Sequence, residues 1–182
     1  MSKRIKAPAV LSTPIQWGKL GPIATQSRPV KPEGLTSAGN SAAVLFDALK
    51  VELNGAAGGL NAASFAAFQL PVSVDLKKGF LGFLVHVRGA ATVSAGGRVS
   101  LTVCVNGRAE VASLNLAEGA ADDTPFLHEQ FVVEQRGAAE TNPNVLPVEP
   151  LLVTFTLVAR RSSVQDLAIL NVDGVDVLAC FG

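Results

Sequence analysis

The sequence predicts an all-β protein, an antiparallel β-sandwich of jelly-roll type that follows an extended N-terminal arm. Apolar and polar residues alternate with a period of two along several segments, as half-buried strands require. Asn106-Gly107 and Asp173-Gly174 separate such segments, and these dipeptides favour two-residue β-hairpins. Five of the ten prolines lie within residues 1–40, where they disfavour helices and central strands.

The N-terminal segment is interpreted as an arm, residues 1–42, and the remainder, residues 43–182, as one sandwich domain. A chain of 182 residues is long enough to bury a core without disulfides or metals. The arm carries large apolar side chains, which a plain linker does not need. We therefore expect it to lie extended across another surface, through an interface formed by Ile15, Trp17, Leu20 and Ile23. The alternative is a disordered tail.

Charge is distributed unevenly, although the formal net charge is zero. Residues 1–43 contain six Lys or Arg and one Glu, whereas residues 44–182 contain nine Lys or Arg and fourteen Asp or Glu. The arm is therefore basic and the body acidic. This asymmetry either reflects chance and solubility, or indicates that the arm binds an acidic neighbour such as an identical subunit.

The first part of the body is ambiguous. Residues 44–53 fit a strand or a short helix, and the alternation from Leu49 to Leu53 favours a strand in the second half. Residues 56–68 are rich in Ala and predict a short helix or an irregular loop. From Gln69 onward the β pattern is steady. Strands are expected within residues 72–74, 81–88, 99–105, 108–116, 126–135 and 151–159.

The last segment is apolar on both faces. A turn at Asp173-Gly174 is expected to join residues 167–172 to residues 175–181 in a second hairpin. One face of this hairpin carries Leu170, Val172, Val175 and Val177, and the other carries Leu167, Ile169 and Leu178. A sheet with one solvated face should not show this pattern. Either the hairpin lies in the middle of the sandwich, or Leu167, Ile169 and Leu178 are covered by another subunit or by the arm.

Residues for catalysis or metal binding are scarce, and we expect no enzyme, no cofactor and no metal site. The sequence lacks the HExxH, GxSxG, GxGxxG and GxxxxGK[ST] motifs. His86 lies mid-strand and is interpreted as a surface or interface residue, while His128 and Glu129 are expected to point to opposite faces. Cys104 and Cys180 form no CxxC pair, so two unpaired thiols are the default and a disulfide stays open.

Composition argues against several kinds of binding. With Trp17 as the sole Trp and no Tyr, the chain is poorly equipped to bind sugars or to stack on bases. The cations of the arm are too widely spaced for a nucleic-acid tail, and Arg160-Arg161 is interpreted as a solvated strand end. No uncharged apolar run approaches the ~18 residues of a membrane span, and no secretory signal is visible. We therefore expect no membrane contact, no direct nucleic-acid contact and a reducing compartment.

Two stretches carry a family resemblance. The segment from Lys78 to Leu116, with its Val105-Asn106-Gly107 turn, and the closing strand from Val175 to Phe181 resemble jelly-roll modules of bacteriophage virions. Similar trimeric sandwiches occur in capsid decoration (cement) proteins and in head fibres, and the arm is similar in kind to arms that connect capsid subunits. The resemblance transfers no functional residue.

The resemblance implies a virion structural protein, of the decoration or minor capsid type, that is located in the capsid and assembled in the host cytoplasm. The implied partners are further copies of the chain, with a trimer favoured, and a capsid shell protein. A single jelly-roll major capsid protein is the alternative within the same class. A lectin-like module on a fibre is the alternative from another class, and the scarcity of Trp and Tyr argues against it.

Overall fold

The computed structural model describes residues 15–20, 24–25, 32–56, 58–74, 79–112, 114, 124–132 and 146–182. In these ranges the chain forms eleven β-strands and no helix, which confirms the all-β prediction. The strands are β1 (Ile15–Trp17), β2 (Ala24–Thr25), β3 (Pro32–Ala38), β4 (Ser41–Leu53), β5 (Asn61–Val74), β6 (Phe80–Val93), β7 (Gly97–Val105), β8 (Arg108–Val111), β9 (Thr124–Val132), β10 (Leu146–Arg161) and β11 (Ala168–Phe181). The described part of the chain therefore offers no helix that could cross a membrane.

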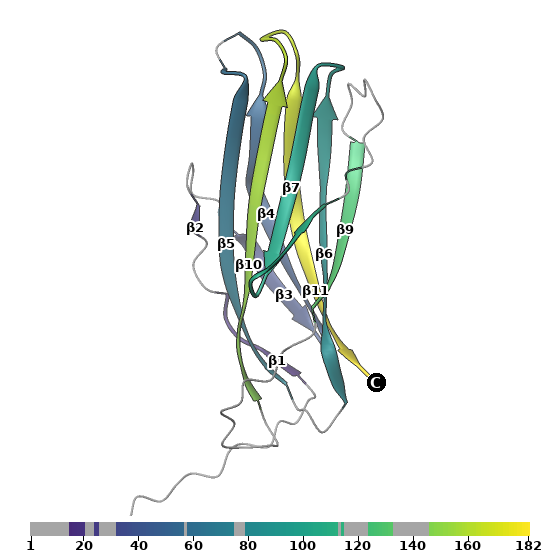
Figure 1. The fold of residues 1–182 in the computed structure, drawn as a ribbon. Coiled ribbons are helices and arrows are strands. Elements are labelled where there is room, and N and C mark those ends of the chain that lie inside the picture. The colour runs from purple at the N-terminus through teal and green to yellow at the C-terminus, as the bar shows by residue number, and fades with distance from the viewer. Residues whose placement is uncertain are drawn as a thin grey trace, which may run out of the picture.

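Strands β4 to β11 form two antiparallel sheets that pack face to face (Figure 1). Sheet A contains the order β5-β10-β7-β8, and sheet B contains the order β4-β11-β6-β9. The chain therefore changes sheet at every connection from β4 to β11 except the turn between β7 and β8. This is the strand order of a jelly roll, so the predicted fold class is confirmed.

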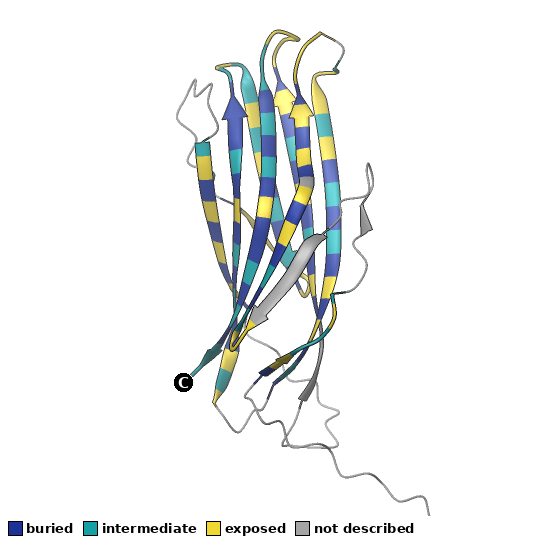
Figure 2. Cartoon of the chain, turned by 180° about the vertical axis from the view of Figure 1, so that it is seen from behind, coloured by how far each residue is buried: buried dark blue, intermediate teal, exposed yellow. Residues whose placement is uncertain are grey.

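The core lies between the two sheets and is built from alternate side chains of each long strand. Figure 2 shows buried and exposed residues alternating along the strands. Phe46, Phe68 and Phe155, from three different strands, form an aromatic cluster with ring centroids 5.8 to 6.1 Å apart. Because inward-facing side chains of one chain fill this space, the apolar residues on the outer faces are available for other contacts.

Three short strands lie within residues 1–42, the segment predicted to be an arm. β1 pairs with β5, where Ile15 lies opposite Val74; β2 also pairs with β5, and β3 pairs with β4. β1 lies at one edge of sheet A and β3 at one edge of sheet B. Edge positions suit a proline-rich segment, because an edge strand does not need all of its N–H donors. Part of the predicted arm is thus hydrogen-bonded to the domain of its own chain.

Two ambiguous segments are strands. Residues 44–53 belong to β4, and the helix or loop predicted for residues 56–68 is wrong, because β5 begins at Asn61. Phe65 and Phe68, which have helical spacing, point to opposite faces of β5, with Phe68 buried and Phe65 only partly buried. Burial every second residue, rather than the local Ala content, therefore decides the conformation of this segment.

The hairpin predicted at Asp173-Gly174 is wrong, because β11 runs without a turn between β4 and β6. A β-bulge occupies the dipeptide, and the register with both neighbouring strands shifts between Val172 and Gly174. A Cβ on Gly174 would lie 3.0 Å from the carbonyl oxygen of Val44, so the close approach of β4 favours glycine here.

The hairpin predicted at Asn106-Gly107 is confirmed. The two residues join β7 to β8 and have φ values of 48° and 81°, the left-handed conformations that a tight hairpin turn requires. Asn106 Oδ1 also accepts a hydrogen bond of 2.8 Å from the backbone N–H of Leu152 on β10. The turn is thereby connected to the neighbouring strand of sheet A.

Candidate interaction surfaces

Face B, the outward side of β4, β11, β6 and β9, carries an apolar patch. Leu45, Leu127 and Phe131 are exposed there, with exposed fractions of 36%, 58% and 47%. Leu178, Leu84 and Phe131 lie opposite one another on β11, β6 and β9, so that an apolar row crosses three adjacent strands. The outward side of an antiparallel sheet is normally polar, and a contiguous apolar row marks a candidate interaction surface.

One ion pair and one contact between a histidine and a glutamate lie beside this patch. Asp176, His86 and Glu129 are opposite one another on β11, β6 and β9, in the row next to the apolar one. His86 Nε2 lies 3.0 Å from Glu129 Oε1 but lacks hydrogen-bond geometry, and Arg88 Nη1 lies 3.1 Å from Asp176 Oδ2. His86 is thus on the outer surface, and Glu129 points away from the buried His128, as the sequence predicted.

The residues predicted as a C-terminal interface do not all share one face. Ile169 and Leu178 both point outward from β11 onto face B and are partly buried by their sheet neighbours. Leu167 precedes β11, and its carbonyl oxygen accepts a hydrogen bond of 2.9 Å from the backbone N–H of Ser94. The structure therefore brings Ile169 and Leu178 onto the candidate surface and places Leu167 in the connection before β11. Their contact with another subunit stays a prediction.

The residues predicted as the arm interface contact their own domain. Ile15 is 4% exposed and belongs to the core, and Leu20 packs against that core. The Trp17 ring lies 6.1 Å from the Phe83 ring, and Trp17 Nε1 donates to the carbonyl oxygen of Gly39 at 3.2 Å. Ile23 lies outside the described residues. Contact of these side chains with a second copy stays a prediction.

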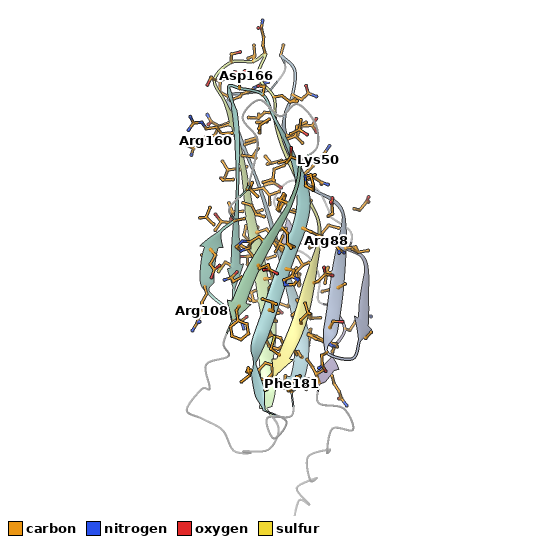
Figure 3. The ribbon with its side chains drawn as sticks, turned by 90° about the vertical axis from the view of Figure 1, so that its right-hand side faces the viewer. Lys50, Arg88, Arg108, Arg160, Asp166 and Phe181 are labelled. Carbon is orange, nitrogen blue, oxygen red and sulfur yellow. The ribbon has the colours of Figure 1, made fainter. Side chains whose placement is uncertain are left out.

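Face A, the outward side of β5, β10, β7 and β8, carries two adjacent arginines. Arg98 on β7 and Arg160 on β10 are opposite each other, and both are exposed. In Figure 3, Arg160 lies on the side of the sandwich away from Lys50 and Arg88, which belong to face B. No Asp or Glu occupies an outward position among the residues of β5, β7, β8 and 151–161 of β10. Arg160 is solvated, as predicted, but Arg161 is buried.

A polar contact joins β8 and β9, the edge strands of the two sheets. Gln130 Nε2 donates to the carbonyl oxygen of Arg108 at 3.0 Å, and His128 Nε2 lies 3.9 Å from Glu110 Oε2. Burial lowers the pKa of His128 below its ordinary value, while the negative charge of Glu110 acts in the opposite direction. The sequence did not reveal this contact, because it depends on β8 facing β9 across the sandwich.

Both cysteines are free thiols. Cys104 lies on β7, on face A, and Cys180 lies on β11, on face B, so the two thiols are on opposite outer sides of the sandwich. Among the described residues, no three His, Cys, Asp or Glu side chains lie close enough together to hold a metal ion.

No protein-family model matches the sequence. No curated protein matches it either.

Solved structures with a similar arrangement of strands include viral and carbohydrate-binding proteins. The VP2 subviral particle of infectious bursal disease virus is 10% identical over 83% of this chain and 34% of that chain, with a TM-score of 0.44. The Gx strain of the same virus is 12% identical over 96% of this chain and 36% of that chain, with a TM-score of 0.41. The chain thus spans about a third of the length of these two viral chains.

A third similar structure is TmCBM61 in complex with β-1,4-galactotriose. It is 14% identical over 90% of this chain and 88% of that chain, with a TM-score of 0.34. Such low similarity carries no argument about what this chain binds. The jelly-roll assignment therefore rests on the order of this chain's own strands.

Proposed function

We propose that this chain is a virion structural protein, of the capsid decoration (cement) or minor capsid type, that acts by binding copies of itself and a shell protein. The observation that carries the proposal is the apolar patch on face B. Leu127 and Phe131 on the edge strand β9 are about half exposed, with fractions of 58% and 47%. Single exposed apolar side chains are ordinary, but a row that crosses adjacent strands is typical of an interaction surface.

The N-terminal strand supports a role in assembly. Since β1 adds to the edge of β5 by backbone hydrogen bonds, the same edge can accept β1 from a second copy. Ile15 of one copy would then occupy, in the second copy, the buried position that it occupies in its own domain. Such an exchange requires no new surface, and it is a general route by which identical subunits associate.

Light scattering coupled to size-exclusion chromatography tests the proposal over a range of concentrations up to about 100 µM. The wild-type chain is expected to be an oligomer, with a trimer favoured. The double variant Leu127→Ser, Phe131→Ser is expected to shift to monomer, since it removes the two most exposed apolar side chains of the patch. Val164→Ser is the matched control, because Val164 is 46% exposed but lies in the connection between β10 and β11.

A wild-type chain that stays monomeric at every concentration would contradict the proposal. Electron microscopy of the associated material separates the two structural roles: closed particles formed by the chain alone would favour a major capsid protein over a decoration protein. A glycan array probed with the monomer tests the remaining alternative. Sugar binding that survives Leu127→Ser, Phe131→Ser would favour a lectin-like module.

A further inference from the structure

The two outer faces carry charged pairs of opposite sign. On face A, Arg98 and Arg160 are cross-strand neighbours on β7 and β10. On face B, Asp47 lies in the stretch of β4 that faces the bulge residue Asp173 of β11, because the flanking pairs are Leu45 with Gly174 and Leu49 with Val172. Like charges placed opposite each other on neighbouring strands destabilise a sheet. The arginine pair is therefore a local cost that an external partner of negative charge would relieve, and the two aspartates give face B negative charge in one region of its sheet.

All four of these side chains are available for such a partner. Each of the four residues is exposed, and none makes an ion pair with another described residue. Asp173 accepts a hydrogen bond from the Asn171 side-chain amide, which holds the carboxylate in place and leaves its negative charge uncompensated. Arg88 lies beside the bulge, but its guanidinium is 3.1 Å from Asp176.

The charge of the whole faces agrees with that of the pairs. Among the residues of β5, β7, β8 and 151–161 of β10, Arg98 and Arg160 are the sole charged residues at outward positions of face A. Face B has an excess of acidic over basic side chains, five carboxylates to two cations. They are Asp47, Glu52, Asp173, Asp176 and Glu129 against Lys50 and Arg88. The two faces therefore attract each other when they belong to different copies.

Apolar contacts accompany the charges on both faces. Face A exposes Leu152 and Val111, with fractions of 38% and 67%, and face B exposes Leu45, Leu127 and Phe131. Exposed ion pairs contribute little affinity by themselves, but they fix which surfaces meet and in which orientation. Burial of the apolar side chains supplies the larger part of the affinity.

From this complementarity we propose that face A of one copy packs against face B of the next, with Arg98 and Arg160 bridging Asp47 and Asp173. This inference rests on the proposed self-assembly and names the two surfaces that carry it. A contact between two different surfaces is heterologous: it closes into a ring when the rotation between copies allows, and forms an open array when it does not. Because face A and face B lie on opposite sides of the sandwich, this contact stacks copies in an open array, which would connect the trimers of the proposed function rather than form them.

Charge reversal with reciprocal rescue tests the inference in the full chain. The variants are Arg98→Glu, Arg160→Glu, which reverses face A, and Asp47→Lys, Asp173→Lys, which reverses face B. Sedimentation equilibrium is expected to show association at least about tenfold weaker for either variant alone, because each then places like charges against each other. The 1:1 mixture is expected to associate again, since every reversed face then meets a complementary one. In that mixture a contact is satisfied wherever the two variants alternate along the array, so the restored assemblies are expected to contain both variants.

Two controls accompany the experiment. Arg108→Glu reverses an exposed arginine on β8 that is not on face A, and it is expected to leave association unchanged. Circular dichroism and the unfolding midpoint confirm that each variant remains folded, as expected for exposed positions. Raising the salt concentration from about 50 mM to about 500 mM is expected to weaken wild-type association, because screening acts on exposed charges.

The outcomes separate this inference from the proposed function. If the wild-type chain associates but both reversed variants associate equally well, the pairing of face A with face B is wrong and self-assembly stands. If both variants are weakened but their mixture is not restored, the four residues do not meet across one interface and the inference is also wrong. If the wild-type chain is monomeric under all conditions, the proposed function fails together with the inference.

Discussion

Arg161 is the buried cation whose removal should damage this fold most. It ends β10 and is 5% exposed, and its guanidinium donates five hydrogen bonds to backbone carbonyl oxygens. The acceptors are Gly59 at 3.0 Å, Val164 at 2.9 Å, Asp166 at 3.2 Å, Gly55 at 3.0 Å and Gly58 at 2.6 Å. An arginine side chain has five N–H donors, so every donor of Arg161 is used. Through these hydrogen bonds Arg161 joins the β4–β5 connection to the β10–β11 connection.

The substitution Arg161→Met keeps the aliphatic part of the side chain and removes every donor. Hydrogen bonds from a charged donor contribute about 1.5–3 kcal/mol each, but five such values cannot add, because the carbonyls of the exposed residues Gly55 and Gly59 regain water once the guanidinium is gone. A carbonyl that stays buried without its donor costs about 1–3 kcal/mol, so the acceptors that cannot regain water together cost about 3–5 kcal/mol. We expect a loss in this range, which is a large part of the roughly 5–15 kcal/mol that stabilises an ordinary domain.

Urea unfolding followed by Trp17 fluorescence measures this loss. Trp17 is the sole tryptophan and lies in β1, at the end of the sandwich opposite the connections that Arg161 joins (Figures 1 and 3), so its signal reports unfolding of the whole domain. Arg160→Met is the matched control, since Arg160 is exposed, and should change the free energy of unfolding by less than about 0.5 kcal/mol. A loss below about 1 kcal/mol for Arg161→Met, or an equal loss for both variants, would refute the reasoning.

Three further predictions concern other described residues. The pKa of His128 is lowered on folding, so the unfolded chain binds a proton at this residue more readily than the folded chain. The free energy of unfolding should therefore decrease as the pH drops below the ordinary value of 6.5. Urea titrations at several pH values should show that His128→Gln, but not His86→Gln, removes this dependence. Ile15→Ala should lower the free energy of unfolding by about 2 kcal/mol, at the low end for a buried residue, because an edge strand can adjust. The variant should also make β1 sensitive to limited proteolysis. Unchanged protease resistance would count against the packing of Ile15. Asn106→Ala should lower the free energy of unfolding, measured by thermal unfolding, by about 1–2 kcal/mol. The variant loses the 2.8 Å hydrogen bond from the Leu152 N–H and places alanine at a φ of 48°. Asn106→Gly should lower it by less, because glycine adopts this φ without strain.

Much of the fold was predictable because side chains along a half-buried strand alternate between buried and exposed, and the sequence shows this alternation as a period of two. The alternation within residues 99–105 and 151–159 identified β7 and β10, and Asn106-Gly107 identified the turn between β7 and β8. These signals are local, since each depends on neighbouring residues of one strand or one turn. They also exclude most helical folds, which is why the fold class followed from the sequence.

The wrong prediction of a hairpin at Asp173-Gly174 has a physical origin, and no pattern within this segment could have corrected it. A two-residue hairpin and a one-residue bulge both place Val172 and Val175 on the same face, so the apolar pattern is identical in the two cases. What distinguishes them is the length of the neighbouring strands. β4 and β6 have 13 and 14 residues, and a continuous β11 of 14 residues pairs with both along their length. That information lies outside the segment itself.

The candidate surface was only partly predictable for the same reason. The sequence showed that Ile169 and Leu178 are an apolar excess on β11, but not that Leu84 and Phe131 continue the row on β6 and β9. The partners of Arg161 were equally hidden, because glycine carbonyls some hundred positions earlier carry no side-chain signal. Residues that act through cross-strand register are visible only when the strand order is known.

The bulge in β11 connects this error to the proposed assembly. A hairpin at Asp173-Gly174 would place Asp173 at an exposed tip, where its charge would have no fixed neighbour. The bulge instead places Asp173 in the middle of face B, opposite the part of β4 that contains Asp47. It also keeps Ile169 and Leu178 on that same face, because the extra residue restores the alternation on the far side of the bulge. One inserted residue therefore gives face B both its central negative charge and its apolar side chains, the two features by which a second copy would recognise it.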